Sequence, residues 1–404
     1  MPALRTGLLD RPHRLESKLR FLPYALDVWC PLLRAAELRK ATIRRTEIIG
    51  KRVALFRDSA GTVGAVLDRC PHRGIELSLG RVCDSSIQCA YHGWRIDRSG
   101  VVISAPGIRR MDPAPSVEAF EVCERYGLIW IFIGDRAIAA STPLPDLAPF
   151  GTDASVDILI SKEVRAHWSL VLDNGLDLFH QHLHRDIPIF FKIESLEGFG
   201  SDGAAFHVHY KAVMSSHYGK RRRGDLRIRA ADGLVTLDLN GFPIIHSVST
   251  PRSADGRRLT TWWFIACPGP WVHRLFTAVV RPIVQRYISR GFDQDAMVLE
   301  SEQRAFERGL RTQIELNPVV LAAHSHYGSR VAQFARSKMR SFKAVELADP
   351  GALLEEINSG AIAVLIYRNG EFALVDPVEL ALSLSRTASV RVVRYANVVV
   401  VCAD

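Results

Sequence analysis

The sequence predicts an α+β protein, in which an all-β N-terminal part precedes a larger part built from antiparallel strands and helices. Residues 29–135 alternate short apolar and β-branched runs with turns rich in Gly, Asp and Ser. Beyond residue 155, strand-like runs occur together with helical periodicity. A chain of 404 residues is too long for one ordinary core, so two or three domains are expected.

Composition changes along the chain suggest where the domains begin and end. We expect four segments: an N-terminal extension over 1–28, a first domain over 29–140, a second domain over 141–340, and a C-terminal extension of unknown role over 341–404. The stretch from Ser141 to Pro149 is rich in proline, which suits a linker between domains.

Local patterns predict the individual elements. In the first domain, residues 53–66 read as a hairpin and residues 127–133 as an apolar strand. In the second domain we expect strands over 205–214, 226–239, 243–250 and 259–267, and helices over 164–184 and 293–311. In the tail, residues 364–374 predict a hairpin with an Asn-Gly turn, and residues 390–402 a second strand pair.

Composition narrows the class of protein. The chain is 48% hydrophobic and 24% charged, as in ordinary globular proteins. Its seven cysteines show no disulfide-framework spacing, which favours a reducing cytoplasm. Charges interrupt residues 1–20, so no signal peptide is expected there. The stretch from Trp271 to Ile288 contains arginines and predicts an amphipathic helix rather than a membrane span; peripheral membrane contact stays open but is not predicted.

Two glycine-bearing motifs carry the first candidate metal site. Cys70 and His72 form a Cys-x-His motif, and Cys89 and His92 form a Cys-x-x-His motif. One thiolate and one imidazole from each loop suit a [2Fe–2S] centre, with both thiolates on one iron and both imidazoles on the other. Structural zinc is the main alternative, although zinc fingers usually pair like residues. A purely structural role for the four side chains is the remaining reading.

These motifs resemble those of a known family. Cys-Pro-His-Arg-Gly and Cys-x-Tyr-His-Gly-Trp are similar to the Rieske domain of Rieske non-haem iron oxygenases. The resemblance implies an N-terminal all-β Rieske [2Fe–2S] domain followed by a helix-grip catalytic domain. Respiratory Rieske proteins carry an extra disulfide pair in these loops, where this chain has Arg73 and Gly93.

A second constellation follows about ninety residues later. His180 and His184 would share one face of a helix, and with a carboxylate they could form a 2-His-1-carboxylate site for Fe(II). Taken alone, this spacing also fits a structural or zinc-binding pair. His182 would point to the opposite side of a regular helix, where a surface or outer-shell role is expected.

The resemblance assigns roles to residues around this pair. It implies His180, His184 and Asp295 as iron ligands, with His182 and Asp293 as the alternatives to the last two. Asp177 would hydrogen-bond a ligand imidazole and would bridge to His92 or His72 of a neighbouring subunit, which implies a homotrimer. Asn174 matches a polar position near the iron.

The resemblance also implies a function: a terminal oxygenase that uses O2 and a mononuclear Fe(II). Its pattern is similar to the vanillate demethylase and pheophorbide oxygenase group. Electrons would come from a ferredoxin or reductase, and NAD(P)H would be oxidised by a separate protein because no Gly-rich dinucleotide motif is present. The net charge of +9 suits an acidic electron donor or simply solvated loops, and without a recognised motif we expect no nucleic-acid binding.

Aromatic side chains in the second domain suggest a hydrophobic substrate, aromatic, polycyclic or steroid-like; these are Phe190, Phe191, Phe199, Phe206, Phe242, Trp262, Trp263 and Phe264. The alternative functions are a Rieske-type electron carrier and a non-catalytic metal-binding protein.

Overall fold

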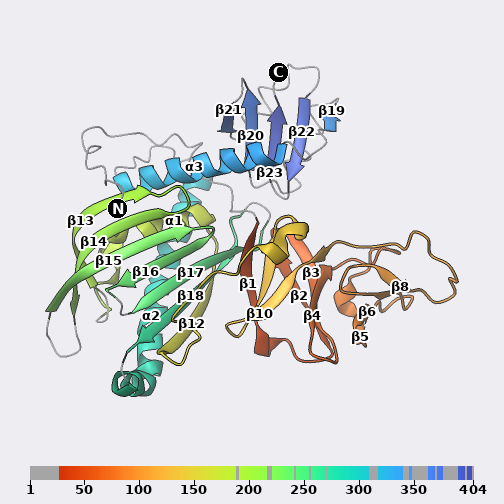
Figure 1. The fold of residues 1–404 in the computed structure, drawn as a ribbon, viewed down its shortest axis with the longest axis horizontal. Coiled ribbons are helices and arrows are strands. Elements are labelled where there is room, and N and C mark those ends of the chain that lie inside the picture. The colour runs from red at the N-terminus through yellow and green to blue at the C-terminus, as the bar shows by residue number, and fades with distance from the viewer. Residues whose placement is uncertain are drawn as a thin grey trace. The chain divides into compact units, whose positions relative to one another are not determined.

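The computed structural model describes most of the chain. Residues 27–187, 191–215, 221–240, 243–253, 256–269, 271–308 and 317–339 are described, together with five strands between 345 and 402. The predicted N-terminal extension lies outside the described residues, apart from its last two. Two compact units result, one over Leu26–Pro145 and the other beginning at Asp146. The division falls inside the proline-rich segment (Figure 1).

The N-terminal unit consists of three small antiparallel sheets. Their strand orders are β1-β11-β10, β2-β3-β4-β9 and β5-β6-β7-β8. The strands are β1 (Val28–Arg34), β2 (Thr42–Ile48), β3 (Lys51–Arg57), β4 (Val63–Leu67), β5 (Arg81–Cys83), β6 (Ser86–Gln88), β7 (Arg95–Ile96), β8 (Val102–Ser104), β9 (Ala119–Phe120), β10 (Val122–Arg125) and β11 (Leu128–Ile133). Short 3₁₀ helices connect them: η2 (Ala35–Glu37), η3 (Leu77–Leu79) and η4 (Arg136–Ser141).

Both strand predictions for this unit are confirmed. β3 and β4 pair antiparallel as the expected hairpin, with Ala54 opposite Val66. β11 is buried along its whole length, as its unbroken apolar run predicts.

The second unit is built on a seven-stranded antiparallel sheet in the order β12-β18-β17-β16-β15-β14-β13. Its strands are β12 (Ser155–Val164), β13 (Phe191–Ser201), β14 (Phe206–Ser215), β15 (Arg221–Ala231), β16 (Leu234–Leu239), β17 (Ile244–Pro251) and β18 (Leu259–Pro268). The helices are α1 (Trp168–Leu176), the 3₁₀ helix η5 (Leu178–His184), α2 (Trp271–Glu307) and α3 (Pro318–Met339).

Helix α2 covers one face of this sheet. Its Val284, Ile288 and Phe292 pack against a cluster that includes Ile158 of β12 and Trp263 of β18. The rings of Trp263 and Phe292 stack with centroids 3.8 Å apart. This contact fixes the α2 turn that carries Asp295 against the sheet.

Helix α1 lies on the same face (Figure 1), and η5 follows it directly in the chain. The Tyr210 hydroxyl on β14 donates to the Leu176 carbonyl at 2.8 Å, and Gln181 of η5 exchanges hydrogen bonds with the Ile193 backbone of β13. An antiparallel sheet with helices on one face confirms the predicted fold class.

Three element predictions need correction. The single helix expected over 164–184 is two elements, α1 and η5, separated at Asp177. The run 226–239 is two strands, because Asp232 and Gly233 both have positive φ and turn the chain. Helix α2 begins far upstream of the expected residue 293.

The tail forms a five-stranded sheet in the order β19-β22-β23-β20-β21. Its strands are β19 (Val345–Leu347), β20 (Ala363–Arg368), β21 (Glu371–Val375), β22 (Val390–Tyr395) and β23 (Val398–Cys402). β20 and β21 pair antiparallel, and so do β22 and β23, as predicted. The Asn-Gly turn between β20 and β21 lies outside the described residues.

Candidate metal centres

Two loops of matching geometry hold the four predicted cluster residues. In the first loop, the Cys70 amide donates to the Ile75 carbonyl at 2.7 Å, and the Gly74 amide donates to the Cys70 carbonyl at 2.9 Å. In the second loop, the Cys89 amide donates to the Trp94 carbonyl at 2.8 Å, and the Gly93 amide donates to the Cys89 carbonyl at 3.2 Å.

Each of these loops depends on one glycine. Gly74 has φ +75° and Gly93 has φ +71°, in the left-handed region that glycine enters without steric cost. The two loops therefore present their Cys and His residues from equivalent backbone turns.

The two thiols of these loops lie deeper in the protein than the two imidazoles. Cys70 and Cys89 are buried within the apolar core of this unit. His72 is exposed and His92 is half-buried, and their ring centroids are 4.5 Å apart. His72 also stacks on Trp94 at 4.6 Å. Two inner thiols and two outer imidazoles fit a [2Fe–2S] cluster ligated by Cys on one iron and His on the other.

The ionisation of these side chains follows from their burial. Burial raises the pKa of the Cys70 thiol, and the neighbouring Cys89 raises it further, while the backbone N–H of His72 opposes the shift. Partial desolvation lowers the pKa of His92, and the nearby His72 and Arg73 add to this effect. This direction favours the neutral imidazole of His92, which is the form that binds metal.

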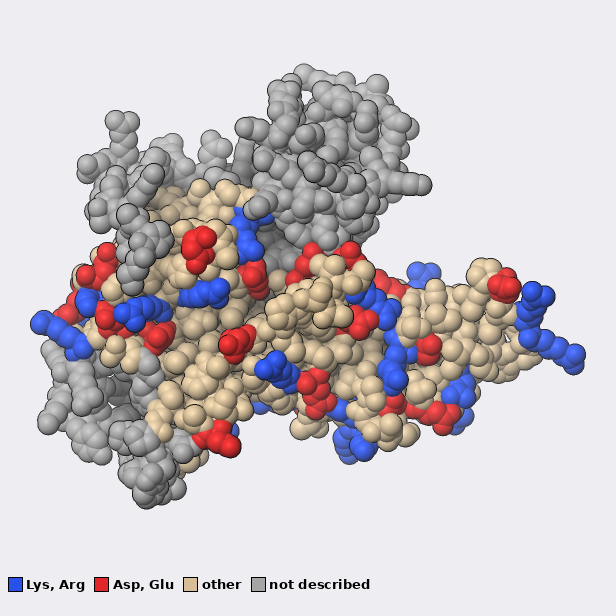
Figure 2. Space-filling view, in the orientation of Figure 1, with Lys and Arg blue, Asp and Glu red and all other residues tan. Residues whose placement is uncertain are grey.

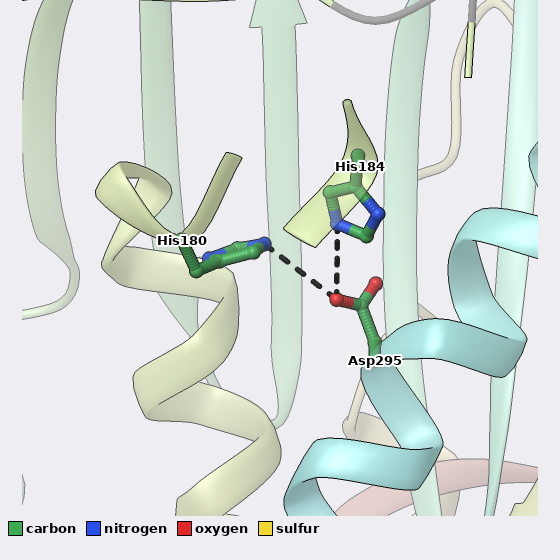
Figure 3. A group of neighbouring side chains, drawn as sticks. All are labelled: His180, His184 and Asp295. Atoms are coloured by element: carbon green, nitrogen blue, oxygen red, sulfur yellow. Dashed lines mark ion pairs between the residues drawn. The ribbon is translucent and has the colours of Figure 1, made fainter. Parts of the chain in front are cut away.

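The second centre brings together His180 and His184 of η5 and Asp295 of α2 (Figure 3). One ligand atom from each residue lies within 4.8 Å of the others. His184 Nε2 is 3.1 Å and His180 Nε2 is 3.6 Å from Asp295 Oδ1. Two nitrogens and one carboxylate oxygen converging from neighbouring elements fit a 2-His-1-carboxylate iron site.

Hydrogen bonds fix the tautomer of both imidazoles. His180 Nδ1 contacts the Asp177 carbonyl, and His184 Nδ1 lies 3.0 Å from Gln294 Oε1. Since both acceptors are oxygens without a proton, each Nδ1 must be the protonated nitrogen. Each Nε2 then carries the lone pair and faces Asp295, where it could bind a metal.

The electrostatics of His184 reflect its buried position. Burial lowers the pKa of His184, but the hydrogen bond and charge of Asp295, together with the Gln294 amide, raise it above the usual value. A bound cation would take the place that a proton otherwise has between Nε2 and the carboxylate.

The alternative ligands lie elsewhere. Asp293 forms an ion pair with Lys162 at 2.7 Å, and its side chain is 58% exposed. His182 is exposed, whereas His184 is buried. The structure therefore groups His184 and Asp295, rather than His182 and Asp293, with His180.

The prediction for the Asp177 carboxylate is wrong within this chain. α1 ends at Leu176, and Asp177 caps η5 by accepting a hydrogen bond from the Phe179 amide at 3.0 Å. Its contact with His180 comes from the backbone carbonyl instead. Asn174 does lie near the site, since its Nδ2 is 3.5 Å from Asp295 Oδ1.

Three contacts that position the site were missed from the sequence. Gln294 holds His184, as described above. His324 of α3 binds Asp173 of α1 at 2.7 Å, and Gln303 of α2 accepts from the buried His167 amide that begins α1 at 3.0 Å. His324 and Gln303 are both buried. No sequence spacing links these partners, because they meet only in the folded chain.

The predicted aromatic residues divide between two faces of the sheet. Trp263 faces α2, whereas Phe264 contacts Phe150 on the opposite face. The side chains of Phe206 and Trp262 are also buried. Phe190 and Phe242 lie outside the described residues, and the Phe191 side chain is not described. Only part of the aromatic set therefore shares the face of the metal site.

Comparison with known proteins agrees with both centres. The pattern described as "Rieske [2Fe-2S] domain" matches residues 28–121. Over 336 residues the chain is 30% identical to the 4beta-methylsterol monooxygenase of Methylococcus capsulatus (strain ATCC 33009 / NCIMB 11132 / Bath), which covers 77% of this chain and 89% of that protein.

Solved structures show the same fold. Dicamba monooxygenase bound to 3,6-dichlorosalicylic acid has a TM-score of 0.61 at 21% identity, covering 79% of this chain and 100% of that chain. The oxygenase of a carbazole 1,9a-dioxygenase oxygenase–ferredoxin complex has a TM-score of 0.56 at 19% identity, covering 76% of this chain and 89% of that chain. From the similarity over most of both sequences, the chain belongs to the Rieske non-haem iron oxygenases and is an oxidoreductase of the catalytic α-subunit type.

Proposed function

We propose that this chain is the terminal oxygenase that oxidises a hydrophobic, sterol-like polycyclic substrate with O2. The observation that carries the substrate class is the similarity to a methylsterol monooxygenase over most of both proteins. The grouping of His180, His184 and Asp295 supports an oxygenase rather than an electron carrier, which would need only the cluster.

The residues of the two centres have distinct roles. A bound cluster would supply single electrons, and a bound Fe(II) would supply the O2 chemistry. Cys70 and Cys89 would ligate the buried iron of the cluster, and His72 and His92 the outer one. At the second centre, Asn174 donates toward Asp295 Oδ1 and so helps to orient the carboxylate. Which methyl or ring carbon of the substrate reacts would depend on how the substrate lies beside His180, His184 and Asp295.

The surroundings of the second centre favour an apolar substrate. Phe179, next to His180, packs edge-to-face on Tyr210 at 5.8 Å. Leu178, two residues before His180, is buried. A polar substrate would need hydrogen-bond partners here, whereas an apolar ring system gains from contact with such side chains.

We further propose an acidic ferredoxin as electron donor, with a separate reductase oxidising NAD(P)H. Apolar Leu79 and Tyr91 are 65% and 58% exposed near the cluster loops, and Arg73 and Arg81 are exposed beside them. Figure 2 shows Lys and Arg side chains at several places on the N-terminal unit, which carries these loops. Apolar contacts with basic neighbours suit a transient complex with an acidic protein.

The predicted homotrimer and its Asp177 bridge remain part of this proposal. Asp177 uses one carboxylate oxygen on the Phe179 amide, which leaves its other oxygen available to a neighbouring subunit's cluster histidine. A cytoplasmic location, where a soluble donor protein is accessible, is also proposed.

Product identification tests the proposed function. The purified protein would be incubated with a surrogate ferredoxin and reductase, NADPH and ¹⁸O2, separately with a 4-methylsterol and with a methoxybenzoate. We expect one ¹⁸O atom in a sterol product and no turnover of the small aromatic acid. Turnover of the methoxybenzoate alone would contradict the sterol-like assignment. If neither compound were oxidised although the cluster was fully reduced, the proposal that the chain oxygenates sterol-like substrates would be contradicted.

Gln294→Leu should weaken iron binding without affecting the cluster. The substitution removes the acceptor that holds His184 Nδ1, and changes of such outer contacts typically cost about 10–100-fold in metal affinity. Iron titration of chelated protein, followed by the nitric-oxide complex in electron paramagnetic resonance, measures the affinity. Gln294→Glu keeps an acceptor and should retain most of it. Equal affinities of Gln294→Leu and wild type would show that the contact does not position His184.

A further inference from the structure

The N-terminal half of α2 presents apolar side chains to solvent. Val279 is 72% exposed and Ile283 is 60% exposed. They are four residues apart and therefore lie on the same face of the helix. Among the side chains of α2 that the structure describes, Val284, Ile288 and Phe292 pack against the sheet cluster, and they point the other way. In Figure 1 the first turns of α2 extend past the edge of the sheet.

The same segment is basic. No Asp or Glu occurs between Trp271 and Phe292, whereas this stretch contains Arg274, Arg281, Arg286 and Arg290. The last three arginines are exposed. An apolar stripe with arginines and no acidic residue is typical of helices that lie in a membrane interface.

We propose that the exposed face of α2 formed by Val279, Ile283 and the neighbouring Arg281, Arg286 and Arg290 binds the surface of an anionic phospholipid bilayer. Val279 and Ile283 would enter the boundary between headgroups and acyl chains, while the arginines contact lipid phosphates. None of the helices that the structure describes is long and apolar enough to cross a membrane.

Charge distinguishes this occupant from a second copy of the chain. A copy would bring its own arginines to the same place, because equivalent surfaces meet in a two-fold contact. At a net charge of +9, the chain as a whole is also attracted to anionic lipid. An anionic bilayer satisfies both the apolar stripe and the charge.

The site lies on the helix that carries Asp295. α2 has 37 residues, and Asp295 follows Ile283 by about three turns. Membrane contact there would bring the iron site close to lipid-dissolved compounds. This consequence depends on the proposed sterol-like substrate, whereas membrane binding itself does not.

Vesicle sedimentation without substrate tests the proposal. Full-length protein would be mixed with phosphatidylcholine vesicles that contain or lack phosphatidylglycerol, at low and high salt. We expect binding to the anionic vesicles that weakens at high salt. The V279D/I283D double variant should bind more than about tenfold more weakly, because it removes the two apolar side chains that would be buried in the bilayer. R281E/R286E should also reduce binding.

Ile103→Asp is the matched control, since it changes a 48% exposed isoleucine in the N-terminal unit and should bind like wild type. Intact cluster absorption would show that the variants fold. Wild type that ignores anionic vesicles, or a double variant that binds them equally well, would overturn the proposal. A third outcome would also overturn it: wild type does not bind vesicles, and light scattering shows that the double variant has lost an oligomer that wild type forms. A second copy of the chain would then cover the stripe. Failure to oxidise a sterol, with vesicle binding intact, would contradict only the proposed function.

Discussion

Asp295→Asn is expected to abolish oxygenation while leaving the cluster intact. Asparagine keeps the shape of the side chain but removes the negative charge that faces both imidazoles, at 3.1 and 3.6 Å. Changes to outer contacts of metal ligands already cost about 10–100-fold, so loss of a carboxylate that would itself bind the iron should reduce activity more than about 100-fold.

Metal content separates this effect from unfolding. Wild-type protein should hold about three irons per chain, and the variant about two, with unchanged visible absorption. The cluster should still accept an electron from a reduced donor. Asp293→Asn is the control, because that carboxylate pairs with Lys162 at the surface, where such pairs contribute at most about 1 kcal/mol. A fully active Asp295→Asn protein would show that Asp295 is not an iron ligand.

The sequence predicted best where chemistry and local geometry coincide. The cluster residues lie in two short loops, each closed by its own glycine, so neighbouring residues determine their placement. The β3–β4 hairpin follows from two short apolar runs on either side of a tight turn. Such features depend on a few adjacent residues and can be read without knowing the rest of the fold.

The prediction failed at places where a local signal competes with periodicity. Apolar spacing suggested one helix through Asp177, but Asp is a strong N-cap residue and its carboxylate binds the Phe179 amide. The chain therefore restarts as a 3₁₀ helix, and the Asp177 carbonyl reaches His180 in place of the carboxylate. β13 was missed because two register shifts and its glycines, Gly198 and Gly200, weaken the alternation.

Contacts between distant segments lay beyond sequence reasoning. Gln294 and His184 are separated by 110 residues, and His324 and Asp173 by 151. Neither Gln294 nor His324 belongs to a motif, and their partners are decided by how α2 and α3 pack over the sheet. The ligands could be proposed from residue type and resemblance, but the groups that orient them required the fold.

Cys89→Ala should have the converse effect, losing the cluster while keeping the mononuclear site. Cys89 is buried in the core of the N-terminal unit, and its loop is closed by backbone bonds that alanine can also make. The fold of the loop should therefore survive, but one iron would lack a thiolate ligand. The visible absorption should disappear, and iron should fall to about one per chain.

The two variants together test whether both centres are needed in one reaction. Cys89→Ala should not oxidise substrate with a reduced donor, although it should still bind nitric oxide at the remaining iron. Cys83→Ala is the control, since Cys83 is partly exposed on β5 and belongs to neither loop. If Cys89→Ala still oxidised substrate at the wild-type rate with a ferredoxin donor, electrons would reach the second centre without the cluster. The division of labour between the two metal sites would then be wrong, even with all seven candidate ligands correctly placed.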